Sequence, residues 1–347
     1  MPLIISCEKD DIVLSYGDYN VTESEFTYYL AMYKGRFDKV YTDFEDTKEY
    51  YSTVIDENGL TREKFLFNMA VDSVKMTLAA CVIFDEYGLI LSDSTIDAVD
   101  EFIDSLIYDY ANGDEKALEE ELAQFGIDLK TLREIYLRDE KVAALLEFLY
   151  GSGGEIGISD EDRMNFILEN YVRVCHIYVN TKYKYSTDED GYLIYTSDGY
   201  AQTEPLSMEE LKTKNALVSA IDESLAEGGD YVEIYKALSE DKYYENGYYF
   251  TRSSNFITEV IDASFSLEVG EWVKFESAYG VHYVKRLEMD DSPWTNDANS
   301  DFFSSLDDTI ASTFYTEIID REKENVGENE SVLKKFSLID SPTNYRF

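Results

Sequence analysis

Val172-Arg173-Val174-Cys175-His176-Ile177-Tyr178-Val179 is rich in β-branched and aromatic residues, in contrast to the helical spacing that precedes it. Such a composition predicts a strand, here over Arg173–Asn180. Two further strands are predicted downstream, at Val273–Ser277 and Val281–Leu287. The chain has only two histidines, and one lies in the first of these strands and the other in the last (His176 and His282).

Helical periodicity dominates on both sides of this β-rich segment. Two capping boxes, Thr22-Glu23-Ser24-Glu25 and Ser207-Met208-Glu209-Glu210, mark helix starts, and Gly151-Ser152-Gly153-Gly154 marks a hinge. Asp190-Gly191 and Asp198-Gly199 predict hairpin turns. We expect helices at residues 26–37, 61–87, 93–110, 115–126, 129–149, 159–171, 207–228, 231–239, 257–265 and 300–324, and a short strand at Ile12–Ser15. Helices, then a compact mixed unit, then one last helix predict an α+β fold of two or three domains.

The charge of the chain argues against binding to nucleic acids. Its 347 residues include 72 acidic and 30 basic residues, a formal net charge of -42. Such a surface repels phosphates, so we expect no nucleic-acid partner. A simple gain in solubility explains the acidity equally well.

Three cysteines and two histidines show no paired ligand spacing, and Ser186–Ser197 lacks the final glutamate of a calcium loop, so we expect no metal and no cofactor.

The three cysteines lie in different settings. Cys81 belongs to an apolar run and is expected to be buried, and Cys175 lies in the first predicted strand. Cys7 follows Leu3-Ile4-Ile5-Ser6 and precedes a charged run, like the end of a bacterial lipobox. We interpret Cys7 as a lipidation site, although no basic region precedes it, and an accidental cysteine in a short apolar N-terminus is the alternative. No other segment is expected to cross a bilayer.

Five blocks of the sequence resemble, in order, the motifs of parvulin-type prolyl isomerases. The opening strand Val172–Val179 resembles V-R-A-S-H-I-L-V, and both histidines fall at the two histidine positions of the family. The other four blocks are Gly229–Asp241, Gly247–Phe250, Ala263–Glu271 and Tyr279–Lys285. The resemblance covers about residues 172–288 and implies a four-stranded antiparallel sheet with helices.

The resemblance also implies a site. In the family two histidines face each other on the sheet and an acidic or thiol residue lies beside the substrate carbonyl, which implies His176, His282 and Asp241 here. A purely structural histidine pair, and a surface carboxylate at the end of a helix, are the alternatives. The expected substrate-binding residues are Phe250, Phe256, Val260 and Tyr279, and Val260 stands where the family has an aromatic ring.

The flanking regions resemble the helical frame of PrsA- and SurA-type foldases. The implied organisation is an N-terminal segment 1–21, a chaperone-like region 22–170, an isomerase domain 171–289 with an insert at 182–206, and a C-terminal helix within 290–347 that packs back on the helical region. The implied function is an extracytoplasmic foldase, anchored to the bacterial membrane through Cys7, that acts on unfolded secreted polypeptides and forms a possible homodimer. A non-catalytic holdase and a surface scaffold lipoprotein are the alternatives.

Overall fold

The structure is a computed structural model that describes residues 10–244 and 246–346. The chain divides into two compact units: unit 1 contains the N-terminal part up to Gly157 and the segment Ala311–Phe347, and unit 2 contains Ile158–Ile310. The division falls within helix α12 (Leu306–Glu322). The fold class is α+β, as the sequence predicts.

Unit 2 is built on a four-stranded antiparallel sheet with the order β6-β3-β8-β7. The strands are β3 (Val172–Val179), β6 (Tyr248–Phe250), β7 (Trp272–Glu276) and β8 (Val281–Leu287). The strands predicted around the two histidines are thus confirmed, and they are direct neighbours. The helices of the unit are α7 (Asp160–Asn170), α8 (Met208–Ala226), α9 (Tyr231–Leu238), α10 (Thr258–Ser266) and α11 (Ser300–Phe303).

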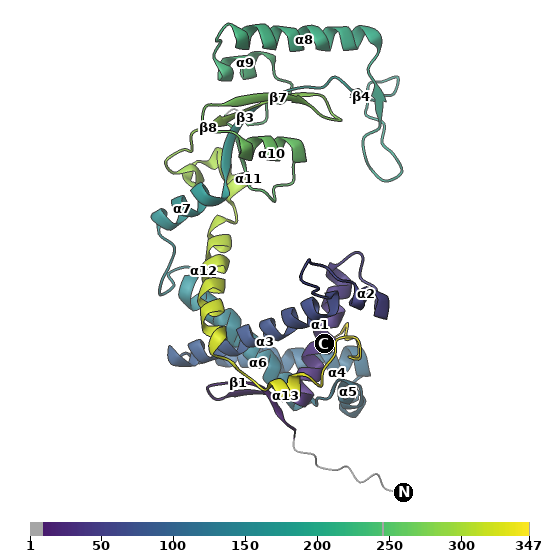
Figure 1. Cartoon of the computed structure of the whole chain (residues 1–347), viewed down its shortest axis with the longest axis vertical. Coiled ribbons are helices and arrows are strands. Elements are labelled where there is room, and N and C mark those ends of the chain that lie inside the picture. The colour runs from purple at the N-terminus through teal and green to yellow at the C-terminus, as the bar shows by residue number, and fades with distance from the viewer. Residues whose placement is uncertain (1–9, 245, 347) are drawn as a thin grey trace. The chain divides into compact units, whose positions relative to one another are not determined.

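Alternation along β3 assigns its side chains to two cores, because successive residues of a strand point to opposite faces. Cys175, Ile177 and Val179 pack against α8 and α9, whereas Val172 and Val174 pack against α10. Figure 1 shows α8 and α9 on one face of the sheet and α10 on the other. The face that carries α10 is therefore the face to which His176 points.

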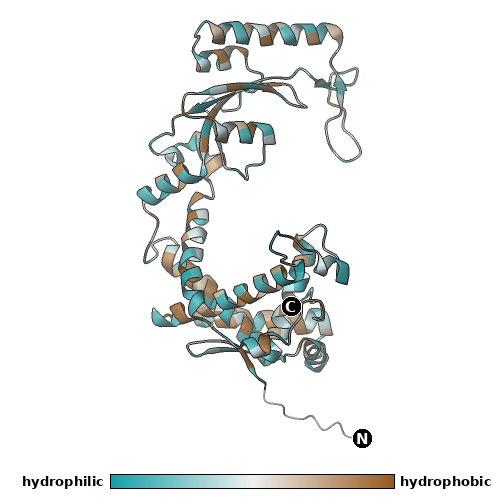
Figure 2. Cartoon of the chain, viewed as in Figure 1, coloured by the Kyte–Doolittle hydropathy of each residue, from teal (hydrophilic) through white to brown (hydrophobic). Residues whose placement is uncertain are grey.

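Unit 1 is mainly helical, with a small three-stranded sheet of order β2-β1-β9. Its strands are β1 (Ile12–Tyr16), β2 (Tyr19–Thr22) and β9 (Gly327–Glu328), and its helices are α1 (Glu23–Val40), α2 (Lys48–Ser52), α3 (Arg62–Glu86), α4 (Asp93–Ala111), α5 (Glu115–Leu122), α6 (Leu129–Tyr150), the end of α12 and α13 (Glu330–Leu333). Both hydrophilic and hydrophobic residues line these helices in Figure 2, as in amphipathic helices that cover a core. The prediction of one continuous helix over residues 300–324 is wrong in one respect, because the helix is interrupted between α11 and α12.

Helix α3 is the one helix among the described residues that is long and apolar enough, by length and composition alone, to cross a membrane. The expectation of no such segment was therefore too strict. However, 61% of the apolar window is buried inside the protein, where Leu66, Val74 and Leu78 belong to the core of unit 1. Cys81, also on α3, is fully buried as predicted. The burial is that of a core helix.

The C-terminal tail is held against α1 by close backbone packing. The amide of Asn344 donates to the carbonyl of Ala31 at 2.9 Å. A Cβ atom on Gly35 would lie 1.9 Å from the carbonyl oxygen of Asn344, so only glycine allows this approach. The buried ammonium of Lys34 donates to the carbonyls of Ile339 and Ser341. This tail closes one side of the core of unit 1.

Candidate functional site

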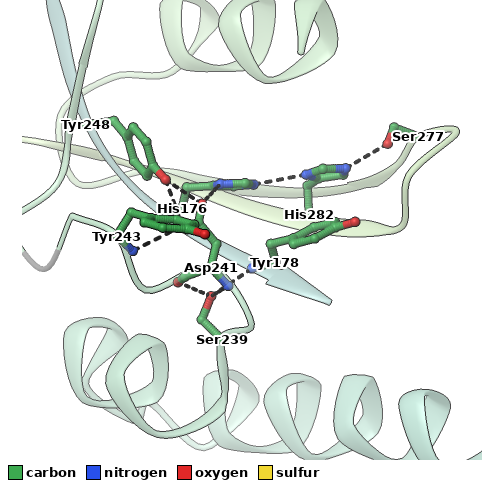
Figure 3. A network of polar contacts seen from close by, with 8 residues as sticks. All are labelled: His176, Tyr178, Ser239, Asp241, Tyr243, Tyr248, Ser277 and His282. Atoms are coloured by element: carbon green, nitrogen blue, oxygen red, sulfur yellow. Dashed lines mark hydrogen bonds and ion pairs between the residues drawn. The ribbon is translucent and has the colours of Figure 1, made fainter. Parts of the chain in front are cut away.

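A chain of hydrogen bonds runs across the α10 face of the sheet in unit 2 (Figure 3). His176 Nδ1 lies 2.9 Å from Asp241 Oδ2, and His176 Nε2 lies 2.9 Å from His282 Nδ1. His282 Nε2 in turn lies 2.7 Å from Ser277 Oγ. At the other end the hydroxyl of Tyr248 donates to the carboxylate of Asp241 at 2.7 Å. Five side chains are thus connected, from the strands β3, β6 and β8 and from the loops that follow α9 and β7.

The register of the sheet explains why the two histidines meet. Tyr178 of β3 pairs with His282 of β8, so His176, two residues earlier on the same face, is a diagonal neighbour of His282. The two rings stack with centroids 5.2 Å apart. Asp241 lies in the loop after α9. Strand β6 pairs with only the first part of β3, and this loop lies along the remaining part, where the amide of Glu240 donates to the carbonyl of Tyr178.

The protonation pattern follows from the order of donors and acceptors. Burial alone would raise the pKa of Asp241, but hydrogen bonds from His176 and Tyr248 outweigh it and lower the pKa. Asp241 is therefore a carboxylate that accepts from His176 Nδ1–H. His282 then donates its Nδ1–H to His176 and accepts from the hydroxyl of Ser277. Burial, and then the proximity of His176, lowers the pKa of His282 to about 4, so its ring is neutral at pH 7.

The two imidazoles are enclosed by aromatic rings. Tyr178 stacks over His282 at 5.0 Å, and Phe275 stacks on its other side at 5.1 Å. Phe256 meets His176 edge to face at 5.7 Å. His176 is 2% exposed and His282 is 0% exposed. The two histidines are therefore shielded from solvent, and their polar contacts are with the groups of this network.

A pocket of about 500 Å³ lies beside this network, and most of its lining is aromatic. Its rings include Tyr248, which holds Asp241, and Phe256, which contacts His176. The full lining is Tyr171, Tyr243, Tyr244, Tyr248, Tyr249, Phe250, Thr251, Ser254, Asn255, Phe256, Asp301 and Phe302. A pocket of this size and apolar character has room for a small ligand.

The residues predicted to bind substrate do not all line this pocket. Phe250 and Phe256 do. Val260 is fully buried, because α10 turns its side chain into the core formed with β3 and β8, so it backs the site and forms no part of its surface. Tyr279 is half-exposed and lies near Tyr178, whose hydroxyl donates to its carbonyl, outside the pocket lining. Cys7, the predicted lipidation site, lies outside the described residues.

Sequence reasoning assigned no role to Tyr178, Tyr248 and Ser277. A signal exists for Tyr178, which follows His176 by two residues and so shares its face of the strand. Ser277 lies at the end of a predicted strand, just before the turn that leads to His282. Nothing local points to Tyr248, because its hydroxyl meets Asp241 only after the loop between them has folded.

No family model matches the chain, and no curated protein matches it. Among solved structures, PrsA from Bacillus subtilis is 19% identical, with 82% of this chain and 93% of that chain covered and a TM-score of 0.25. The peptidylprolyl isomerase PrsA from Bacillus cereus is 15% identical, with 94% and 97% covered and a TM-score of 0.29. The foldase protein PrsA from Lactococcus lactis is 14% identical, with 96% and 100% covered and a TM-score of 0.25. At such identities and TM-scores, the likeness carries no argument about what this chain does.

Proposed function

We propose that this protein is a foldase that binds unfolded polypeptides and speeds the cis–trans isomerisation of their X-Pro bonds. The observation that carries the proposal is the hydrogen-bonded chain of Asp241, His176, His282 and Ser277 beside an aromatic pocket. The resemblance of five sequence blocks to parvulin-type isomerases points the same way.

The chemistry needs no cofactor and no covalent intermediate. An X-Pro bond isomerises slowly because a barrier of about 20 kcal/mol protects the planar amide. A catalyst lowers that barrier by binding the twisted amide more tightly than either planar form. In this proposal the pocket around Phe256 holds the prolyl ring, and the network fixes the charge and position of Asp241 and the hydroxyl of Tyr248. His176 and His282 are positioning residues, since they are buried.

A non-catalytic holdase is the second candidate, and two observations favour it. The Asp241 carboxylate already accepts hydrogen bonds from Tyr248 and His176, so it has few lone pairs left for a substrate. Val260 withdraws into the core where the family carries a ring. A holdase would use the same aromatic pocket to bind chains without speeding their isomerisation.

The cellular setting belongs to the same proposal. We place the protein outside the cytoplasm, attached to the bacterial membrane by a lipid on Cys7, where it would meet unfolded secreted polypeptides. The short aliphatic run Leu3–Ser6 before Cys7 supports this anchor. We also propose that the helical region 22–170 and the segment 290–347 form the chaperone frame into which residues 171–289 are inserted. Mass spectrometry of the native protein tests the lipid, and a mature Cys7 without one contradicts it.

Refolding of a client protein limited by prolyl isomerisation separates the candidates. A foldase shortens the slow refolding phase in proportion to its concentration, and it leaves unchanged the refolding of a matched client whose critical proline has been replaced. A holdase suppresses aggregation of both clients without shortening the slow phase. If neither effect occurs with folded protein, the foldase and holdase proposals both fail and a scaffold that binds one folded partner takes their place.

A further inference from the structure

The insert in unit 2 carries a surface that the proposed isomerase site does not use. The short strands β4 (Tyr183–Tyr185) and β5 (Thr203–Pro205) pair antiparallel at its base. Beyond them, residues 186–202 form what we call the tyrosine arm. In Figure 1 the arm projects from the end of β4, away from the four-stranded sheet of the same unit.

The arm has a defined backbone although it has no core. Two tight turns, at Gly191 and Gly199, fold it into three short segments. Ser186 N donates to the carbonyl of Gln202 at 2.8 Å, Ile194 N to that of Ser186 at 3.0 Å, and Gln202 N to that of Ile194 at 2.7 Å. The hairpin turns predicted from Asp190-Gly191 and Asp198-Gly199 are thus confirmed. A surface fixed in this way loses little entropy when a ligand binds.

Aromatic rings on this backbone lie open to solvent. Tyr192 is 73% exposed, Tyr195 60% and Tyr200 75%, and Tyr185 at the base of the arm is 56% exposed. Leu193 is also exposed. Such a concentration of exposed rings on one hairpin is characteristic of a binding surface rather than of a solvated loop.

The charge of the arm selects the ligand. Between Lys184 and Lys212 the sequence has no lysine or arginine. The four carboxylates of the arm are all exposed, and none of them forms an ion pair among the described residues (Asp188, Glu189, Asp190 and Asp198). The two lysines at the base are already paired, Lys182 with Glu276 and Lys184 with Glu204 and Glu210. The arm therefore presents tyrosine faces and unneutralised carboxylates together.

We infer that the tyrosine arm binds extended polypeptide segments that carry lysine or arginine among apolar residues. The faces of the tyrosine rings would contact the cations and the apolar side chains of the ligand. The carboxylates would form ion pairs with its lysine and arginine residues. A second copy of this chain is a poor occupant, because each copy carries a net charge of -42. The inference relies on the proposed function only for the source of the segment, an unfolded client.

The base of the arm lies close to the histidine network. Tyr183 lies beside Tyr178, and Tyr178 stacks on both histidine rings. A client segment on the arm would consequently hold a neighbouring part of its chain near the site. Basic residues near a proline would then raise the local concentration of that proline.

Binding is tested with a proline-free fluorescent peptide that contains lysines and phenylalanines, so that isomerase activity has no influence. Anisotropy at low salt is expected to show binding, with a twin peptide that has glutamine for each lysine bound about tenfold more weakly. High salt is expected to reduce the difference between the twins. Equal affinity for both twins overturns the inference.

Three variants locate the surface. Asp188→Asn/Glu189→Gln/Asp190→Asn/Asp198→Asn removes the charge, and Tyr192→Ser/Tyr195→Ser/Tyr200→Ser removes the rings; each should weaken binding of the lysine peptide about tenfold. The third replaces residues 186–202 by Asn-Gly, a turn that fits the direct pairing of Tyr185 with Thr203, and should abolish binding.

The matched control neutralises four exposed carboxylates elsewhere in unit 2 (Glu223→Gln/Glu227→Gln/Glu259→Gln/Asp262→Asn) and should change affinity less than twofold. If the control weakens binding as much as the arm variants do, the general charge of the protein attracts the peptide and the inference fails. It also fails if the variant without the arm still binds. Because the arm-deleted variant retains the whole histidine network, its activity on a short X-Pro peptide reports on the proposed function separately.

Discussion

His282 is expected to make the stability of unit 2 depend on pH. Its pKa is about 4 in the folded protein, against about 6.5 in an unfolded chain. Between these values the unfolded state binds a proton that the folded state does not, so stability falls as the pH is lowered from 6.5 to 4. At about 1.4 kcal/mol for each pH unit, the full effect is about 3 kcal/mol, of which about 2 kcal/mol is lost between pH 7 and pH 5.

Urea unfolding followed by tryptophan fluorescence reports on the stability of unit 2. Both tryptophans of the chain, Trp272 and Trp294, lie in unit 2. The wild type and His282→Asn are compared at several pH values between 5 and 7. The many carboxylates of the chain titrate in both proteins, so their contribution cancels in the difference.

We expect the free energy of unfolding of wild-type unit 2 to fall by about 2 kcal/mol more than that of His282→Asn between pH 7 and pH 5. Ser277→Ala is the control: it removes one hydrogen bond to the ring but leaves the ring in place, so the dependence on pH should remain. Equal slopes for the wild type and His282→Asn would refute the buried, neutral histidine on which the protonation pattern rests.

Three further predictions concern other parts of the molecule. Tyr248→Phe removes a donor to a buried carboxylate and should lower the stability of unit 2 by about 2 kcal/mol in the same fluorescence assay; unchanged stability would show that the carboxylate does not need this partner. Gly35→Ala should displace the tail at Asn344 and cost about 1–3 kcal/mol, seen as faster hydrogen exchange in the tail; unchanged exchange would contradict the close packing. Cys81 and Cys175, whose burial raises the pKa of both thiols to about 12, should react with a thiol reagent only after unfolding, and fast reaction in the folded state would contradict their burial.

The elements predicted well from the sequence are those with strong local signals. The capping boxes at Thr22 and Ser207 start α1 and α8 as expected, and the turn residues at Gly191 and Gly199 form the expected hairpins. By contrast, β9 escaped prediction because two residues carry no periodic pattern. It forms only because it pairs with Leu14 and Ser15, which lie near the other end of the chain.

The candidate site shows the same division. The strand pattern around His176 and His282 predicts that each ring lies on a sheet, and the family resemblance predicts that the two rings meet. The partners Tyr248 and Ser277 depend on how two loops fold, which no local pattern determines. The side chain of Val260 is buried in the core, as the apolar pattern of its helix suggests. Its assignment to the pocket rested only on its position in the family resemblance.

The rate of cis–trans isomerisation of a short X-Pro peptide, measured by exchange NMR with and without the purified protein, tests the central proposal most directly. We expect acceleration that Phe256→Ser abolishes, since this ring joins the pocket to His176. The control Tyr108→Ser, which changes an exposed ring of unit 1, should retain it. An uncatalysed rate with folded, wild-type protein would contradict the isomerase and leave a holdase that uses the same pocket only to bind.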